Sequence, residues 1–414
     1  MPESHAPILP VSGSVLRHRA FTLFLLSRTF SNLAFQMQAV AIGWQVYGLT
    51  GSAFALGMVG LAEFVPALLL AFVVGHVADR FNRRLIVQLC QVVQGLAIAG
   101  LAIGTFHGSL GVDAIFGAIF VIGCASAFVA PTRQAMLPAL VPPALLSRAL
   151  SWSSTFGQAS VICGPALGGL LYAISPGAVY AVSAALIALS FGAIALIRME
   201  PVVPRRDPVT LASVFAGVSF IRSRPELLGA ISLDLFAVLL GGATALLPIF
   251  AQDILSVGPW GLGVLRSAPA MGALGMSFVL AQVPLDRRVG RIMFASVAVF
   301  GLATIVFALS TSFWLSIASL IVLGAADSIS MIIRGSLVQL QTPNEMQGRV
   351  SAVYFIFVGT SNELGEFESG LTASWFGAVP AAVIGGIGTL VVLLLWMRAF
   401  PALLNHDRLD ASAD

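Results

Sequence analysis

The sequence predicts an all-α polytopic membrane protein whose twelve transmembrane helices form two pseudo-symmetric six-helix bundles. Composition is the first reason: of 414 residues, 58% are hydrophobic and only 9% are charged, whereas soluble domains carry about a quarter charged residues. The second reason is that the apolar residues gather in runs of the roughly 20 residues that a helix needs to cross a bilayer. The third is that the second half of the chain repeats the first.

Twelve apolar runs reach spanning length. Six are expected in the first half, at residues 21–47, 53–74, 85–106, 113–129, 147–172 and 179–197. Six more are expected in the second half, at 227–254, 261–283, 292–309, 313–338, 350–376 and 379–397. This order divides the chain into an N-terminal tail (1–19), a first bundle (20–197), a linker (198–225), a second bundle (226–398) and a C-terminal tail (399–414).

The placement of arginine orients these spans in the membrane. All 21 basic residues are arginine, and the loops that follow the odd-numbered spans, such as 48–52 and 107–112, contain none. The loops that follow the even-numbered spans carry several, as do both tails. The positive-inside rule therefore predicts that these loops and both termini are cytoplasmic. We expect this charge to face anionic lipid, and we expect no nucleic-acid partner.

The linker combines two kinds of sequence. It begins with a Pro-rich stretch, after which Leu211, Val214, Phe215, Val218 and Ile221 recur at helical spacing. This pattern predicts a short amphipathic helix, which either lies on the cytoplasmic face or leads into the seventh span. Both interpretations are compatible with the sequence.

The two halves repeat each other in order. Matches at an offset of 201 are Arg133 with Arg334, Pro142 with Pro343, Arg148 with Arg349, Gly164 with Gly365 and Gly169 with Gly370. At an offset of 207, Asp79-Arg80 and Arg84 match Asp286-Arg287 and Arg291. Parallel six-helix repeats of this kind are found in secondary transporters.

No enzyme signature is present in the sequence. The three cysteines, Cys90, Cys124 and Cys163, lie within apolar runs without pairing or metal-ligand spacing. There is no lysine, so a phosphate-binding loop of the Gly-rich, lysine-containing kind is excluded. We therefore expect no catalytic residues, no disulfide, no metal and no cofactor.

The loop after the second span carries the most specific motif. It reads Gly75-x-x-x-Asp79-Arg80-x-x-Arg83-Arg84, which resembles the signature loop between the second and third helices of the major facilitator superfamily. A second, degenerate copy contains Asp286, Arg287 and Arg291, with Gln282 in the place of the first glycine. The resemblance implies that both loops help to latch the cytoplasmic side.

A second motif lies in the fifth span. Gly164, Pro165, Gly168 and Gly169 resemble the Gly-Pro-x-x-Gly-Gly signature of exporters in this superfamily. Glycine lets helix backbones approach closely, and proline removes a backbone hydrogen bond and kinks a helix, which suits a hinge. The alternative interpretation is ordinary packing of small residues.

Ionisable residues inside the spans are costly and so indicate function. The candidates for proton or substrate coupling are Arg28, Glu63, Asp234, Arg266, Asp327, Glu363 and Glu366. Glu363 and Glu366 share a helix face, and two such close carboxylates are costly to ionise together, which favours proton coupling. Glu368 lies on another face and is expected to be structural.

The sequence allows more than one pairing for these ionisable residues. Arg28 and Asp234 lie at similar depth and are expected either to form an ion pair that changes between states or to bridge the halves permanently. Glu63 and Arg266 are interpreted as cavity residues or as a fixed bridge. Arg133 and Arg334, near the cytoplasmic ends of their spans, are assigned to the cytoplasmic gate or to an interface.

Two further stretches resemble the branch of the superfamily that contains enterobactin exporters and macrolide efflux proteins. They run from Trp44 through Thr50 to Pro66, and from Arg334 through Pro343 to Val350. The resemblance implies a monomeric, inner-membrane antiporter that exports a small organic molecule, siderophore-like or drug-like, in exchange for protons by alternating access. The alternatives are a proton-coupled uptake symporter of a small metabolite, a membrane-embedded enzyme and a transport-inactive sensor.

Overall fold

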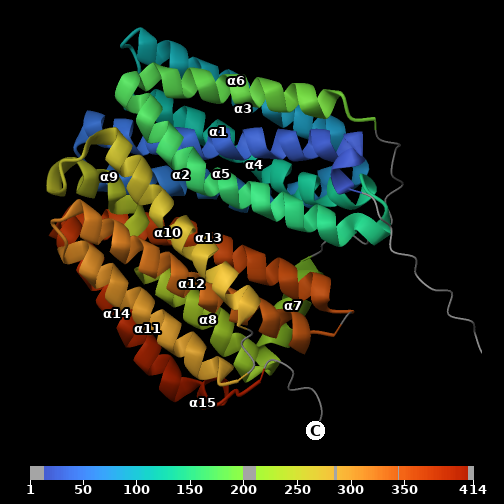
Figure 1. Ribbon diagram of the computed structural model, residues 1–414, viewed down its shortest axis with the longest axis vertical. Helices are drawn as coiled ribbons and strands as arrows, with labels where there is room; N and C mark the ends of the chain where they lie inside the picture. The colour runs from blue at the N-terminus through green and yellow to red at the C-terminus, as the bar shows by residue number, and fades with distance from the viewer. Residues whose placement is uncertain (1–13, 199–210, 284–286, 344, 409–414) are drawn as a thin grey trace, which may run out of the picture.

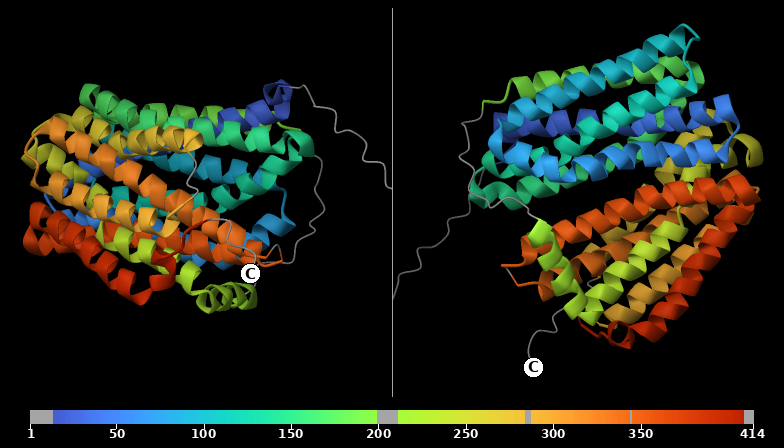
Figure 2. Two further views of the ribbon diagram at one scale, coloured as in Figure 1. Left: turned by 60° about the horizontal axis from the view of Figure 1, so that its bottom comes forward. Right: turned by 180° about the vertical axis from the view of Figure 1, so that it is seen from behind.

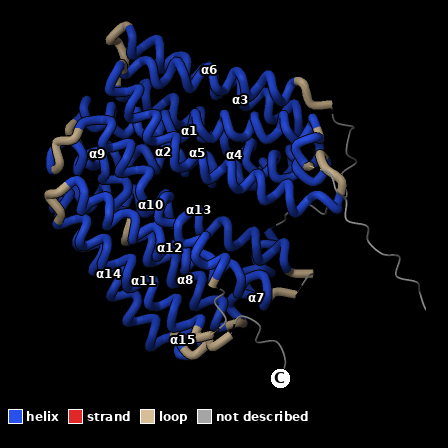
Figure 3. The backbone as a smooth tube through the Cα atoms, viewed as in Figure 1, coloured by secondary structure: helices blue, strands red, loops and turns tan. Residues whose placement is uncertain are grey.

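The computed structural model describes residues 14–198, 211–283, 287–343 and 345–408, and within these it contains helices but no strand (Figures 1 and 3). The helices lie side by side in two groups, one formed by each half of the chain (Figure 1). The expected Pro-rich part of the linker, 199–210, lies outside the described residues. This all-helical arrangement agrees with the predicted fold class.

The first half forms a bundle of six long helices. They are α1 (Arg19–Thr50), α2 (Ala53–Arg80), α3 (Arg83–Phe106), α4 (Val112–Met136), α5 (Leu146–Ile174) and α6 (Pro176–Ala195). α1 packs against α5 and α6, α3 packs against α4 and α6, and α2 packs against α4. α1 to α5 extend beyond their predicted apolar runs at one or both ends, because the residues there continue the backbone hydrogen bonding of the helix, whereas α6 begins before its predicted run and ends before residue 197.

The second half repeats this arrangement. Its long helices are α8 (Pro225–Leu240), α10 (Gly258–Gln282), α11 (Val289–Leu309), α12 (Phe313–Gln341), α13 (Gln347–Phe376) and α14 (Ala378–Ala399). α12 packs against α10 and α11, and α14 packs against α8 and α11. The linker helix α7 (Leu211–Ser223) rests on α8 and α13, and the short α15 (Pro401–Leu404) follows α14.

Among the described residues, ten helical segments are both long enough and apolar enough to cross a membrane. α1 and α13, at 32 and 30 residues, are also long enough but lie outside that set. Arg28 and several glutamines lower the hydropathy of α1, and three glutamates lower that of α13. These ten segments together with α1 and α13 make up the twelve predicted spans. The count of twelve therefore depends on α1 and α13, the two helices with the most polar interiors.

The seventh predicted span is not one continuous helix. α8 ends at Leu240 and is followed by a 3-10 turn η4 (Ala243–Leu246), a short α9 (Leu247–Ile249) and a π-helical turn η5 (Phe250–Ile254). The break falls at Gly241-Gly242, where a methyl group on Gly242 would lie 2.5 Å from the carbonyl oxygen of Gly365. Two glycines weaken the helix here, and they let the chain approach α13 closely.

The two halves meet through two helix pairs, α5 with α10 and α2 with α13. We call the end of the molecule where α1 begins and α14 finishes the terminal end, and the opposite end the far end. The halves are closest at the far end and diverge toward the terminal end (Figure 2). At the far end Tyr47 donates a hydrogen bond to the Asp253 carboxylate, and the Gln252 Nε2 donates to the Trp44 carbonyl at 3.3 Å.

Glycines allow this close approach at the far end. A methyl group on Gly169 of α5 would lie 3.1 Å from the Cα of Gly263 in α10. A methyl group on Gly57 of α2 would likewise lie 3.1 Å from the Cα of Gly370 in α13. Gly169 and Gly370 are the repeat-related pair of the sequence, so equivalent glycines join the halves on both sides.

Candidate functional site

A cavity of about 1170 Å³ lies toward the terminal end, next to the diverging halves. Its walls come mainly from α1, α3, α4 and α5, and Gln339 of α12 contributes from the second half. Its polar lining includes Arg28, Asn32, Gln94 and Arg133. The cavity reaches the last turns of α4 and the first turn of α5, so it is accessible from the terminal end.

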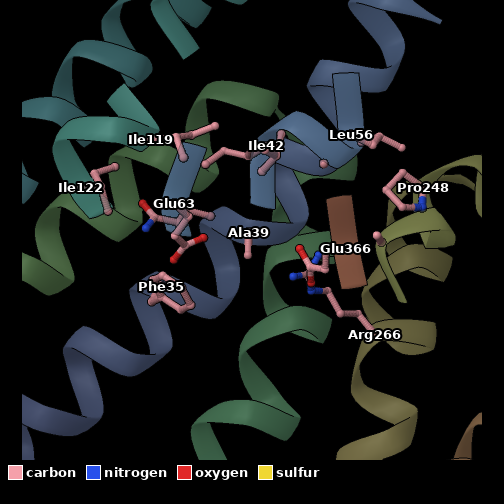
Figure 4. Close-up of a pocket in the computed structure, with 14 residues that line it drawn as sticks. Phe35, Ala39, Ile42, Leu56, Glu63, Ile119, Ile122, Pro248, Arg266 and Glu366 are labelled. Carbon is pink, nitrogen blue, oxygen red and sulfur yellow. The ribbon is translucent and has the colours of Figure 1, made fainter. Parts of the chain in front are cut away.

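A smaller pocket of about 50 Å³ continues the cavity toward the middle of the molecule (Figure 4). The two spaces share Phe35, Gln38 and Ile122 as lining residues. Glu63 of α2 enters this pocket from the first half, whereas Arg266 of α10 and Glu366 of α13 enter from the second. Three of the predicted coupling residues are therefore assembled where the halves meet.

Glu363 joins the same group, which we call the central carboxylates: Glu63, Glu363 and Glu366. Their charges interact with one another and with Arg266. Gly60 provides the space, since a methyl group there would lie 3.0 Å from the Glu366 Cβ. Within the described residues, no carboxylate lies within 4.0 Å of the Arg266 guanidinium. Glu63 and Arg266 therefore line a cavity and do not form a contact ion pair.

Chemically, this group has more carboxylates than countercharge. One guanidinium serves three carboxylates in a setting where an unpaired charge is costly. Binding one proton, or one positively charged group, relieves that cost. Glu368, by contrast, accepts a hydrogen bond from Thr372 one turn later on α13, at 2.8 Å. It does not line the pocket.

Asp234 takes part in a different cluster, and this corrects the expected pairing with Arg28. Its carboxylate forms an ion pair with Arg334 inside the second half. Arg334 is only 3% exposed and its Nε donates to the Tyr354 hydroxyl at 3.1 Å. Asp327 lies close enough for its charge to interact with both members of the pair. Asp234 and Asp327 are thus separated from the central carboxylates.

Arg28 instead faces the large cavity together with Arg133. The Arg28 Nη1 donates to the Ser153 hydroxyl at 2.7 Å, and the Arg133 Nη2 donates to the Ser31 hydroxyl at 2.7 Å. The sequence position of Arg133 and Arg334 predicts residues of the cytoplasmic gate or of an interface. The structure places both inside bundles, because each projects from a helix toward buried polar partners.

The signature loop is described in part. Gly75, Asp79 and Arg80 lie in the last turns of α2, but the side chains of Asp79 and Arg80 and the whole of Asp286 lie outside the described residues. The Arg83 Nη1 donates to the Ala135 carbonyl at 2.9 Å, and the Arg84 Nη2 donates to the Ala195 carbonyl at 2.6 Å. Both bonds join helices of one half. Of the second copy, Arg287 and Arg291 are exposed at the terminal end.

The exporter-like motif of α5 faces two neighbours at once. A methyl group on Gly164 would lie 2.5 Å from the Gln36 Cβ of α1, and one on Gly168 would lie 2.7 Å from the Met37 carbonyl oxygen. Gly169 faces α10 across the halves, and Pro165 lies between these contacts within the helix. The motif therefore packs α5 against its own bundle and against the other one.

Several lining residues were not among the sequence candidates. Gln94 of α3 bonds to Ser126 of α4 at 3.0 Å, and both line the cavity. Ile187 of α6 also lines the cavity. Serine and glutamine are common as polar links between membrane helices, so their presence in a span carries little signal.

Comparisons with known proteins identify the family to which this chain belongs. The family described as Transmembrane secretion effector matches residues 11–413. The enterobactin exporter EntS of Citrobacter koseri is 26% identical over 389 residues, covering 92% of this chain and 91% of that protein. EntS of Escherichia coli is 25% identical over 400 residues, covering 94% of each.

Solved structures of transporters share the fold. A mutant of the nucleoside transporter NupG has a TM-score of 0.74 at 16% identity, covering 92% of this chain and 100% of that one. A bacterial Spinster homologue, in an inward-facing and unoccupied conformation, has a TM-score of 0.72 at 14% identity, covering 95% and 97%. The chain is a multi-pass membrane transporter, not an enzyme, and it belongs to the transmembrane secretion effector family of the major facilitator superfamily.

Proposed function

We propose that this protein exports a small organic molecule, siderophore-like or drug-like, across the cytoplasmic (inner) membrane in exchange for protons. One observation carries the proposal: a cavity reached from the terminal end leads to a group of carboxylates shared by both halves. At the far end the same halves are held together by glycine contacts. A transporter that alternates between two openings requires this arrangement in one of its states.

The direction of opening follows from the arginines. The terminal end carries the arginine-containing loops, which the positive-inside rule assigns to the cytoplasm. The cavity then faces the cytoplasm and loads substrate there. Rocking of the two bundles against each other closes this side and opens the far end, where the α5–α10 and α2–α13 pairs then separate.

Coupling to protons is assigned to the central carboxylates and Arg266. Because these groups come from both halves, a rocking motion changes their separation and therefore the cost of their charges. Protons that enter from the far side neutralise the central carboxylates, and the carrier then returns to the state that is open to the cytoplasm. Arriving substrate displaces those protons toward the cytoplasm. A single chain contains both halves of this pathway, so a monomer is sufficient.

Export, not uptake, is supported by two kinds of resemblance. The relatives are named enterobactin exporters, and α5 carries the exporter-like glycine and proline motif. An uptake symporter would move protons in the same direction as substrate. The two mechanisms therefore differ in the sign of the proton flux.

The test is proton flux in proteoliposomes with an acidic lumen. Candidate siderophores, macrolides and cationic dyes are added outside, and lumenal pH is followed with a trapped indicator. Antiport predicts that a transported compound raises the lumenal pH. Glu366→Gln and Glu363→Gln are expected to abolish this response while the protein remains folded.

Glu368→Gln is the matched control, since it lies on the same helix outside the pocket. It is expected to keep at least half of the parental flux. A compound that lowers the lumenal pH as it is transported would show that the protein is a proton symporter and not a proton antiporter. Unchanged flux in both Glu363→Gln and Glu366→Gln would assign these two residues a structural role.

A further inference from the structure

The large cavity differs in charge from the central pocket, and this difference bears on the substrate. We infer that the cavity binds an organic anion and that Arg28 and Arg133 form its anion-binding site. This inference rests on the proposed export function and names the substrate class of that same pathway.

The charge of the lining is the first argument. Two arginines and several neutral polar side chains line the cavity, and no aspartate or glutamate is among the described residues that do so. Arg28 and Arg133 are close enough for their positive charges to interact unfavourably. Like charges facing one water-accessible space favour an anion between them and disfavour a cation.

Comparison of the two halves gives the second argument. Arg133 and Arg334 are equivalent in the repeat, yet among the described residues Arg334 forms an ion pair with a carboxylate and Arg133 forms none. At the same offset of 201, Ser126 stands where the second half has Asp327. The Arg133 guanidinium contacts the hydroxyl of Ser31, whereas the Arg334 guanidinium contacts the carboxylate of Asp234. The first half therefore keeps the arginine but lacks both countercharges.

The helices that surround Arg133 and Arg334 are arranged alike in the two halves. Gly123 of α4 lies against Glu63 and Pro66 of α2, and Gly324 of α12 lies against Pro269 of α10. Gly123 and Gly324 are also related by the offset of 201. α4 and α12 are thus placed alike in their bundles, so the loss of countercharge beside Arg133 is not caused by a different arrangement of helices.

The hydrogen bonds of the two arginines are the third argument. Each guanidinium is held by a neutral hydroxyl, Ser153 for Arg28 and Ser31 for Arg133, at 2.7 Å in both cases. Such bonds fix the position of a guanidinium without neutralising it. Arg133 is 8% exposed, and its Nε has no hydrogen-bond partner among the described residues. A bound carboxylate or catecholate supplies the missing acceptor.

The rest of the lining suggests what carries the negative charge. Phe35, Ile98 and Ile122 give the cavity an apolar wall, and Phe35 and Ile122 also line the central pocket. A flat aromatic group fits such a wall, and an attached carboxylate or phenolate oxygen reaches the arginines. The ligand class is therefore an aromatic organic anion, which the cavity binds in preference to a cationic drug.

The test measures binding without a gradient, so that it does not depend on proton coupling. Purified protein in detergent is titrated into carboxyfluorescein, an anionic dye, and rhodamine 6G, a cationic dye built on the same ring system. Fluorescence anisotropy is expected to show binding of carboxyfluorescein that weakens as salt is raised, and much weaker binding of rhodamine 6G. One lost charge-assisted contact, worth about 1.5–3 kcal/mol, predicts about 10- to 150-fold weaker anion binding in Arg133→Gln or Arg28→Gln.

Two further variants separate the site from general effects of mutation. Ser126→Asp gives the first half the countercharge of the second, and it is expected to weaken carboxyfluorescein binding as strongly as Arg133→Gln. Arg148→Gln removes an exposed arginine at the same end of the molecule and is expected to change nothing. Melting curves establish that each variant is folded.

Equal binding of both dyes, or parental anion binding in Ser126→Asp and both arginine variants, would overturn the inference. Either result would leave the proton-flux experiment of the export proposal untouched. Conversely, anion binding that is lost in Arg133→Gln while no compound moves protons would support the binding site and contradict antiport.

Discussion

At the residue scale, two equivalent arginines have different surroundings. Arg334 is buried against Asp234, and Arg133 is held by Ser31. A buried ion pair contributes little net stability compared with apolar packing, but removing one partner leaves the other charge uncompensated. The same substitution is therefore expected to have different consequences in the two halves.

Arg334→Gln leaves the Asp234 carboxylate buried without its partner. We expect it to lower the free energy of unfolding by about 3–5 kcal/mol, because an uncompensated buried charge is that costly. The double variant Asp234→Asn with Arg334→Gln is expected to recover part of this loss. The measurement is thermal unfolding in detergent, compared with the unmodified protein.

Arg133→Gln is the matched control for that experiment, since it strands no carboxylate among the described residues. Its loss of stability is expected to be clearly smaller than that of Arg334→Gln. Equal melting temperatures for the two single variants would show that the ion pair does not stabilise the second half.

At the scale of helices, glycines allow two kinds of close helix–helix contact, one between the halves and one within a single bundle. Gly169 packs across the halves, whereas Gly324 packs against Pro269 within the second bundle. In the rocking mechanism proposed above, contacts of the first kind separate during transport and contacts of the second kind persist. A bulky residue at each site should therefore produce different effects.

Gly169→Leu is expected to favour the state in which the far end is open. The added side chain overpacks the α5–α10 contact at a cost of about 1–3 kcal/mol, and separation of the halves removes that cost. The measurement is the distance between spin labels on Thr50→Cys and Ser312→Cys, both exposed at the far end, after the three native cysteines are replaced.

Gly324→Leu provides the comparison within one bundle. It is expected to lower thermal stability without lengthening the distance between the two labels. If Gly169→Leu also left that distance unchanged, the α5–α10 contact would not separate during transport, and the direction of rocking would have to be revised.

At the scale of the whole molecule, transport requires the far end to open. Tyr47 of α1 and Asp253 of η5 connect the halves there. A cysteine pair at these two positions, bridged by a short cleavable thiol-reactive linker, is expected to stop transport completely. Reduction of the linker is expected to restore it, and either single-cysteine variant treated in the same way should remain active.

The linked protein is also expected to keep its affinity for ligand, because the large cavity lies toward the opposite end. Transport that continued at the parental rate in the bridged protein would contradict alternating access through this opening. Binding measurements on the same sample distinguish a locked carrier from an unfolded one.

Much of the fold followed from the sequence alone. Apolar runs of spanning length predicted the long helices, and the ordered matches between Arg133 and Arg334 or Gly169 and Gly370 predicted two similar bundles. These features are local, since a span must satisfy its own backbone hydrogen bonds in lipid. The sequence does not predict the break at Gly241-Gly242, because Gly-Gly pairs also lie within the unbroken helices α5 and α14, and only the fold brings Gly365 against this one.

The candidate site was predicted as a set of residues but not as an arrangement. Charges in apolar spans are costly, so Glu63, Arg266, Glu363 and Glu366 stood out from the sequence. Their partners did not, because helix rotation and the packing of distant spans decide which side chains meet. Only the tertiary structure separated Asp234 from Arg28 and placed Arg28 beside Arg133, since the energy of a charge depends on the neighbours that folding brings to it.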